Sequence, residues 1–191
     1  VYDNMAFGLK LRKMPKDQEQ SERQRKTLEE RHQMSDLERL RHSAAHVMAT
    51  AISRIWPDAP FAAGPPIASG FYYDLEMEHR LSPDDFEKIE AEMKKIVKEN
   101  QKFEKMVVSR DEALELAKSG RLGGLEERDA ESVFKIDLLD QIPEGEEISI
   151  YKNGDFWDLC AGPHVHRTGN CKAFKLMSVA SAFYKGDSAN P

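Results

Sequence analysis

The most regular stretch of this 191-residue chain opens with Ser35-Asp36-Leu37-Glu38-Arg39-Leu40-Arg41-His42-Ser43-Ala44-Ala45-His46. Ser35 and Glu38 have the spacing of a capping box, in which each side chain bonds the backbone amide of the other residue. Apolar residues then recur at helical spacing as far as Ile52, and Pro57 ends the pattern. The sequence therefore predicts a long helix that begins after Ser35 and buries one face.

Helical and extended segments alternate along the rest of the chain. A second helix is predicted from Ser82-Pro83 to about Asn100, and a short third helix over Asp111–Lys118, closed by Gly120. Strands are predicted at Phe71–Leu75, Phe103–Val108, Val133–Leu138, Ile148–Tyr151 and Phe156–Leu159, with one or two more in Ala173–Tyr184. Lys152-Asn153-Gly154-Asp155 is typical of a type I′ hairpin turn. The fold class is α+β, with helices packed on an antiparallel sheet.

Residues 1–34 differ from the rest of the chain. After a short apolar start, Lys10–Gln33 is nearly all charged or polar, which predicts a solvated helix or a flexible segment. We therefore divide the chain into a charged N-terminal segment, 1–34, and a single domain, 35–191. Because the chain starts at Val1 and stops just after an apolar stretch, we expect it to be a fragment of a longer protein.

Composition excludes several classes of protein. No run approaches the ~18 consecutive apolar residues that a membrane span requires, and no signal peptide is evident. The net charge of −6 argues against tight independent RNA binding, although it permits a small basic face or delivery of RNA by a neighbouring domain. Two cysteines, Cys160 and Cys171, do not make a disulfide framework, so we expect a reducing, cytoplasmic location.

Two motifs carry chemically useful side chains. His42 and His46 stand four residues apart on one helix face and can share a metal or a water, although histidines so spaced are more often solvated or core-lining. In Asp158-Leu159-Cys160-Ala161-Gly162-Pro163-His164, the Gly-Pro pair forbids a regular helix. Cys160 and His164 therefore lie at a strand end and its loop, either converging on a pocket or as a buried free cysteine and a loop histidine. By residue type the two motifs together make a four-ligand zinc set.

In this arrangement the chain resembles the second additional domain shared by threonyl- and alanyl-tRNA synthetases. The resemblance covers roughly residues 35–191 in order, and residues 1–34 do not resemble the small N-terminal domain common in bacterial threonyl enzymes. The threonyl type is favoured by Gly64-Pro65-Pro66-Ile67, Gly70-Phe71-Tyr72-Tyr73-Asp74, Phe174-Lys175-Leu176-Met177 and Tyr184-Lys185-Gly186-Asp187-Ser188. The alanyl type usually has Gly-Thr-His where this chain has Gly162-Pro163-His164.

The resemblance implies an editing hydrolase. A threonine-activating site discriminates poorly against serine, because one methyl group is worth only ~1–3 kcal/mol. Bacterial-type threonyl enzymes therefore carry a second site that hydrolyses serine from seryl-tRNA(Thr). Matching the motifs position by position gives the pocket residues His42, His46, Tyr73, Lys135, Asp158, Cys160 and His164.

The resemblance also suggests a role for each of these residues. His42 and Lys135 orient and activate the water, and Asp158 and His46 read the substrate ammonium and side chain or fix neighbouring groups. Cys160 and His164 line the pocket, and Tyr73 can hydrogen-bond the serine hydroxyl. By itself, the sequence favours a Lys135 that protects an edge strand, and it is also compatible with a Tyr73 in the core and an Asp158 that satisfies loop amides. Lys172, Lys175 and Lys185 either contact RNA phosphates or form a solvated basic face.

The threonyl type implies editing by water, with no metal or other cofactor at this site, since a cation beside Lys135 would meet charge repulsion. Two alternatives stay open: a zinc-dependent alanyl-type hydrolase that uses His42, His46, Cys160 and His164, and a non-catalytic tRNA-binding module. The expected partner is the acceptor end of tRNA(Thr) carrying serine. The parent enzyme is expected to ligate threonine to tRNA with ATP, to hold zinc in its separate catalytic domain, and to be a homodimer.

Overall fold

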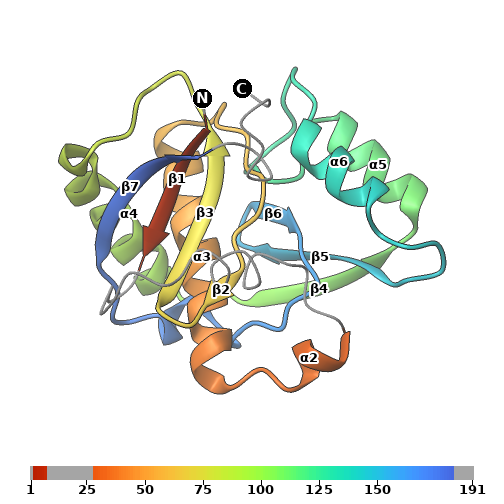
Figure 1. The fold of residues 1–191 in the computed structure, drawn as a ribbon, viewed down its shortest axis with the longest axis horizontal. Coiled ribbons are helices and arrows are strands. Elements are labelled where there is room, and N and C mark those ends of the chain that lie inside the picture. The colour runs from red at the N-terminus through yellow and green to blue at the C-terminus, as the bar shows by residue number, and fades with distance from the viewer. Residues whose placement is uncertain (1, 8–27, 183–191) are drawn as a thin grey trace.

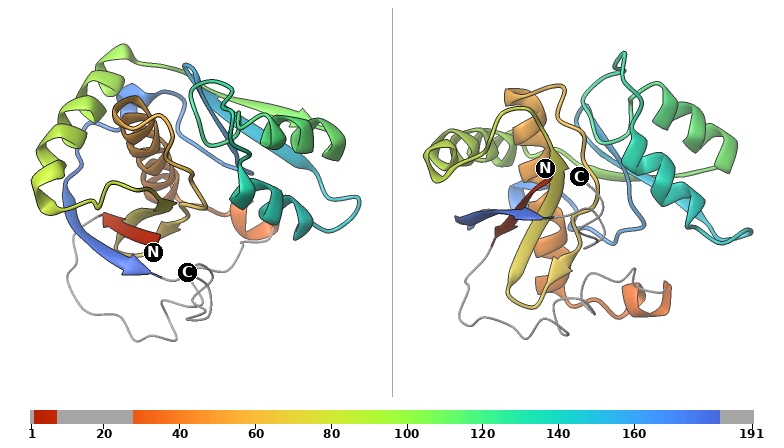
Figure 2. Two further views of the ribbon diagram at one scale, coloured as in Figure 1. Left: turned by 90° about the horizontal axis from the view of Figure 1, so that it is seen from above. Right: turned by 45° about the horizontal axis from the view of Figure 1, so that its top comes forward.

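In the computed structural model, which describes residues 2–7 and 28–182, the strands form two antiparallel sheets. One sheet has four strands in the order β2-β3-β1-β7, and the other has three in the order β4-β5-β6. The predicted α+β class with antiparallel strands is confirmed, although the strands divide between two sheets. Helix α3 lies behind the four-stranded sheet in Figure 1, and Figure 2 shows α5 and α6 on the other side of the molecule from α4.

The described helices are α2 (Leu28–His32), α3 (Asp36–Ile55), α4 (Phe86–Glu99), α5 (Arg110–Lys118) and α6 (Val133–Asp140). The described strands are β1 (Tyr2–Phe7), β2 (Pro66–Ile67), β3 (Gly70–Glu76), β4 (Phe103–Val108), β5 (Ile148–Asn153), β6 (Phe156–Leu159) and β7 (Leu176–Ala182). Short 3-10 turns precede α4 at Pro83–Asp85 and follow the β6 loop at Thr168–Asn170.

Helix α3 starts as its capping box predicts. The Glu38 amide donates to Ser35 Oγ at 3.3 Å, and the Ser35 amide donates to Glu38 Oε2 at 2.9 Å. From His42 to Ser53 every residue of the helix is buried. Its apolar side chains join those of α4 and β3 in the larger of two cores. This packing fixes the position of the helix that carries the two histidines.

The hairpin of β5 and β6 also forms as predicted. The two strands pair antiparallel, and Gly154 adopts the positive φ of 57° that the turn requires. Apolar residues of β4, β5 and β6 pack against α5 and α6 in a second, smaller core. The end of β6 therefore lies between two packed layers, and this is where Asp158 and Cys160 occur.

Strand β1 was not predicted. Residues 2–7 form the strand between β3 and β7, and Met5 pairs with Tyr73 on one side and Val179 on the other. The described part of the N-terminal segment thus includes a strand of the sheet and the short helix α2. The proposed boundary between residues 34 and 35 remains a prediction.

The strand predicted at Val133–Leu138 is wrong. These residues belong to helix α6, which packs on α5. A short apolar run does not by itself distinguish a strand from a buried helix. Here Phe134, Lys135 and Leu139 are buried, a spacing that matches one helical face rather than alternate residues of a strand. Lys135 is consequently a buried helical lysine, not an edge-strand lysine.

Candidate active site

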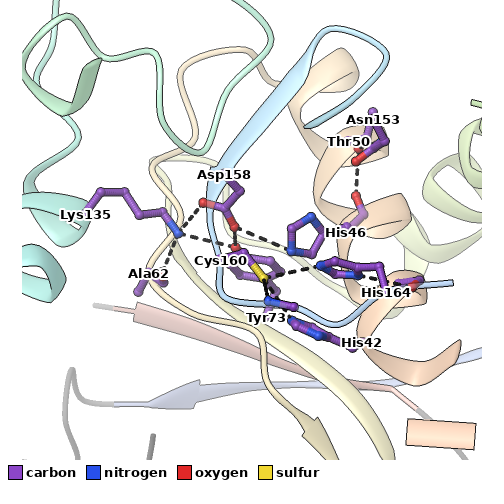
Figure 3. A network of polar contacts seen from close by, with 12 residues as sticks. His42, His46, Thr50, Ala62, Tyr73, Lys135, Asn153, Asp158, Cys160 and His164 are labelled. Atoms are coloured by element: carbon purple, nitrogen blue, oxygen red, sulfur yellow. Dashed lines mark hydrogen bonds and ion pairs between the residues drawn. The ribbon is translucent and has the colours of Figure 1, made fainter. Parts of the chain in front are cut away.

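The two sequence motifs meet where α3 passes the end of β6. His42 and His46 lie on successive turns of α3, Cys160 directly follows β6, and His164 lies in the loop beyond it. The ligand atoms of these four residues all lie within 4.8 Å of one another. Figure 3 shows the imidazoles gathered around the sulfur atom. We call these four residues the His/Cys cluster.

Cys160 is at the centre of the His/Cys cluster. Its Sγ lies 3.3 Å from His42 Nε2 and 3.3 Å from His164 Nε2, and it accepts a hydrogen bond of 3.3 Å from the Gly162 amide. The rings of His42 and His164 stack with centroids 4.1 Å apart, and those of His46 and His164 meet edge to face at 4.3 Å. Each side chain of the cluster therefore contacts at least one other side chain of the cluster.

Burial sets the protonation of the His/Cys cluster. Desolvation lowers the pKa of both His42 and His46 to about 3, and the charge on Lys135 contributes to the shift at His46. Burial also lowers the pKa of His164 well below its usual value and raises the pKa of the Cys160 thiol to about 12. Near neutral pH the imidazoles are therefore uncharged, and the thiol keeps its proton.

The tautomer of His42 follows from its partner. Its Nδ1 lies 3.2 Å from the Pro163 carbonyl oxygen, which can only accept a hydrogen bond. Nδ1 therefore carries the proton, and the lone pair of the neutral ring is on Nε2, which faces the cluster. An imidazole in this state can take a proton from a water molecule.

A second group, the Lys135 network, adjoins the cluster and consists of Lys135, Asp158, Tyr73 and the Ala62 carbonyl. Lys135 Nζ lies 2.7 Å from Asp158 Oδ1, 2.6 Å from Ala62 O and 3.3 Å from the Tyr73 hydroxyl. The Tyr73 hydroxyl donates to Asp158 Oδ2. The contacts with Ala62 O and the Tyr73 hydroxyl are hydrogen bonds, and the contact with Asp158 Oδ1 is an ion pair.

The Lys135 network is removed from solvent. Lys135 and Asp158 are each 1% exposed and Tyr73 is 2% exposed. Burial, and next the Asp158 charge, raise the pKa of Tyr73 well above its usual value, so that this phenol stays protonated. His46 Nε2 lies 3.9 Å from Asp158 Oδ2 and connects the network to the His/Cys cluster.

The start of α6 and the loop before it hold Lys135 in place. At the start of α6, Ser132 Oγ donates to the Leu122 carbonyl at 2.6 Å and accepts from Arg128 at 3.1 Å. Gly123 in the preceding loop has φ +73°, and a Cβ at this position would lie 3.2 Å from Lys135 Cε. The loop therefore forms a wall against the lysine stem.

The His/Cys cluster could hold a zinc ion. Three imidazoles and one thiol are zinc ligands by type. The 3.3 Å from Cys160 Sγ to the Nε2 atoms of His42 and His164 is close to the ~3.5 Å expected between tetrahedral ligands about 2.0–2.3 Å from zinc. The nearby Lys135 charge opposes a cation there, since it already contributes to the lowered pKa of His46. Donor type thus fits zinc, whereas the local charge disfavours it.

The seven predicted residues thus come together in one site, in which every member contacts another. Of the three lysines considered for RNA, Lys172 is exposed, Lys175 pairs with Glu90 at 3.0 Å, and Lys185 lies outside the described residues together with the rest of Tyr184–Ser188. Ser43, Gly123 and the Ala62 carbonyl were not predicted. Ser43 had one signal in the sequence, its place between the two histidines.

Comparison with known proteins agrees with this geometry. A family model described as "Threonyl and Alanyl tRNA synthetase second additional domain" matches residues 148–191. The threonine–tRNA ligase of Acetivibrio thermocellus is 49% identical over 150 residues, and that of Clostridioides difficile is 50% identical over 150, each alignment covering 78% of this chain and 22% of the relative. The threonine–tRNA ligase of Geobacillus kaustophilus is 51% identical over 154 residues, which cover 81% of this chain and 22% of the relative.

The fold, the site and these matches place the chain in the class of aminoacyl-tRNA synthetase editing domains. The chain spans about a fifth of the length of the curated relatives that it matches. Within the class it belongs to the threonyl-tRNA synthetase family, as the resemblance in sequence predicted. Among the described residues, no helix is long and apolar enough to cross a membrane.

Proposed function

We propose that this chain hydrolyses serine from seryl-tRNA(Thr) with an activated water molecule and without a metal ion at the site. The observation that carries the proposal is the contact between neutral imidazoles and the buried Lys135 network. The first group supplies a proton acceptor, and the second supplies a fixed positive charge and a carboxylate. Hydrolysis of an aminoacyl ester requires these components.

His42 is the proposed general base. Its Nε2 lone pair accepts a proton as the water oxygen bonds to the ester carbonyl carbon. When the bond from that carbon to the ribose oxygen breaks, the proton passes to the leaving oxygen, so that serine and free tRNA result. A positioned base typically contributes about 10²–10⁴-fold to the rate.

Lys135 acts mainly through its charge in this proposal. Its ammonium donates hydrogen bonds to Ala62 O and the Tyr73 hydroxyl and forms an ion pair with Asp158, and the bond to the Tyr73 hydroxyl is the longest of these contacts at 3.3 Å. A water can therefore reach the ammonium only by replacing that bond. The ammonium otherwise holds Asp158 in place and favours the negative oxygen that develops in the transition state.

Asp158 and Tyr73 are the proposed substrate-reading groups. A carboxylate accepts several hydrogen bonds, so Asp158 can take one from the substrate ammonium in addition to those from Lys135 and Tyr73. In this proposal the Tyr73 hydroxyl, whose own proton goes to Asp158, accepts a hydrogen bond from the serine hydroxyl. Discrimination would then depend on the extra methyl of threonine, which needs more room than the serine side chain does.

The decisive assay measures release of labelled serine from seryl-tRNA(Thr), with threonyl-tRNA(Thr) beside it, in the presence and absence of a chelator. We expect chelator-resistant hydrolysis of the serine ester alone. His42→Ala and Lys135→Ala should each lower the rate by about 10²–10⁴-fold, whereas His79→Ala, at an exposed histidine outside the site, should not. Hydrolysis of both esters alike would contradict the specificity.

A zinc-dependent hydrolase is the second candidate, because the donor atoms of the His/Cys cluster lie within 4.8 Å of one another. Metal analysis of protein purified without added zinc separates the two. Stoichiometric zinc, together with loss of activity in chelator, would support the zinc enzyme. Binding of tRNA that survives His42→Ala and Lys135→Ala, with no hydrolysis by the wild type, would instead indicate a non-catalytic module.

For the parent protein we propose the activity that the names of the relatives state, ligation of threonine to its tRNA, with ATP as the energy source. Its tRNA would deliver the acceptor end to this domain. A dimeric parent and a cytoplasmic location are part of the same proposal. Both cysteines of this chain are free thiols, which is compatible with a reducing compartment.

A further inference from the structure

Ser43 belongs to the first motif of the site and contacts the second, but the mechanism proposed above gives it no role. It follows His42 on α3 and is fully buried. Its Oγ contacts three polar groups: the Arg39 carbonyl at 2.7 Å, the Val165 amide at 2.9 Å and His164 Nδ1 at 3.1 Å. The hydroxyl thus joins α3 to the loop that carries His164.

The direction of these three bonds is determined by their chemistry. A serine hydroxyl has one proton to donate and two lone pairs. The Arg39 carbonyl can only accept, so it takes the hydroxyl proton, and the Val165 amide can only donate. The hydroxyl can therefore only accept from His164, and His164 Nδ1 carries a proton.

The lone pair of neutral His164 is consequently on Nε2, which faces Cys160 Sγ at 3.3 Å. His42 presents its own Nε2 lone pair to the same sulfur, also at 3.3 Å, because Pro163 O fixes its tautomer. The thiol has one proton for these two acceptors. Whichever imidazole accepts it cannot use the same lone pair on water.

We infer that Ser43 is a positioning residue, which keeps the Nε2 lone pair of His164 available to the Cys160 thiol proton, so that this proton does not have to occupy the lone pair of His42, the proposed base. This inference rests on the proposed function. Without the Ser43 oxygen, His164 is free to carry its proton on Nε2 and to donate it to the sulfur. The thiol proton then turns to His42 Nε2 and occupies the proposed base.

Nitrogen NMR of the chelator-treated, 15N-histidine-labelled wild-type chain tests the tautomer directly. The His164 signals are identified by their loss in His164→Asn. We expect His164 Nδ1 to be the protonated nitrogen and Nε2 the unprotonated one. A proton on Nε2 in the wild type would overturn the inference, and this readout requires no variant of Ser43 to fold.

Ser43→Ala tests the consequence, with Ser53→Ala as the matched control. Ser53 is also buried on α3, and its Oγ has no hydrogen-bond partner among the described residues. We expect Ser43→Ala to shift the His164 proton to Nε2 and to slow seryl-ester hydrolysis by about 10- to 100-fold, within the range of general base catalysis. Ser53→Ala should change neither.

Different results would contradict the role of Ser43 and the proposed function. An unchanged His164 tautomer in folded Ser43→Ala would overturn the role of Ser43, whatever the rate. A wild-type chain that does not hydrolyse the serine ester would contradict the proposed function instead, and the tautomer in the wild-type spectrum would still decide whether Ser43 fixes His164.

Discussion

A buried lysine is costly unless its charge is compensated, and Lys135 has one carboxylate for this purpose. Its ammonium and the Asp158 carboxylate are 2.7 Å apart, and both side chains are almost inaccessible to solvent. Removing one member of such a pair leaves the other as an uncompensated buried charge. The same two side chains therefore affect both the stability of the fold and the proposed chemistry.

Lys135→Met should lower the free energy of unfolding by about 3–5 kcal/mol, because it leaves the Asp158 charge buried without its partner. Urea denaturation measures this change. The control is Lys105→Met, at an ion pair with Glu147 whose side chains are 40% and 45% exposed, where we expect a change of at most about 1 kcal/mol. Equal effects at the two lysines would contradict the burial argument, and adding Asp158→Leu to Lys135→Met should recover most of the loss.

The buried histidines make stability depend on pH. Burial lowers the pKa of His42 and His46 from 6.5 to about 3, so between these pH values the unfolded chain binds protons that the folded chain does not. The free energy of unfolding is therefore fully retained above about pH 6.5 and falls as the pH drops towards 3, by about 1.4 kcal/mol per pH unit for each histidine.

Urea denaturation at pH 7, 6 and 5 in the presence of a chelator measures this slope. His46→Gln removes one titrating group, so its slope between pH 6 and 5 should be smaller by about 1.4 kcal/mol per pH unit. A slope identical to that of the wild type would mean that His46 is protonated in the folded state too.

At the scale of elements, the position of Lys135 depends on the loop before α6. Gly123 has a positive φ and lies against both Lys135 and Phe61. Gly145, in the turn before β5, also has a positive φ, of +82°, but a Cβ there would meet nothing within 4 Å. Substitutions at the two glycines therefore distinguish the effect of backbone strain, which both share, from the effect of contact with Lys135, which only Gly123 has.

Gly123→Ala and Gly145→Ala should both lose about 1–2 kcal/mol of stability from the left-handed backbone. Only Gly123→Ala should also slow seryl-ester hydrolysis, by about tenfold or more, because its methyl displaces the lysine and small misplacements in active sites cost up to ~10²-fold. Rate assays on both folded variants measure the difference. A normal rate in Gly123→Ala would show that the loop does not position Lys135.

Elements with strong local signals were predicted well. The capping box of α3, the Ser82-Pro83 start before α4 and the glycine turn between β5 and β6 each combine a specific residue with a specific backbone position. Val133–Leu138 has no such signal, and its packing on α5 decides that it is a helix. Local chemistry therefore predicts an element only where a cap or turn marks it.

At the scale of the whole molecule, the two termini of the described chain share one sheet. β1 lies between β3 and β7, so it joins the strand that carries Tyr73 to the last described strand. The backbone of β1 makes ladder contacts on both sides. Residues 2–7 thus belong to the same sheet as β3 and β7.

Removing residues 1–7 should lower Tm by more than about 10 °C, because β1 pairs along its length with strands on both sides. A ladder hydrogen bond is worth ~1 kcal/mol and one kcal/mol is worth roughly 2–4 °C in a chain of this size, so the loss of only about four bonds already gives a shift of this size. Thermal denaturation followed by circular dichroism measures the shift. An unchanged Tm would favour the boundary between residues 34 and 35.

By itself, the sequence determined the class of fold, the capped helix with His42 and His46, the motif with Asp158, Cys160 and His164, and the family. Each of these depends on residues close together in the chain or on a match of motifs. Only the tertiary structure decided that Lys135 lies on a helix, that its ammonium contacts Asp158, Ala62 and Tyr73, and that Ser43 contacts a histidine 121 residues away. These contacts join segments far apart in the sequence, and their geometry follows from the packing of α3, α6 and β6 rather than from any local preference of the chain.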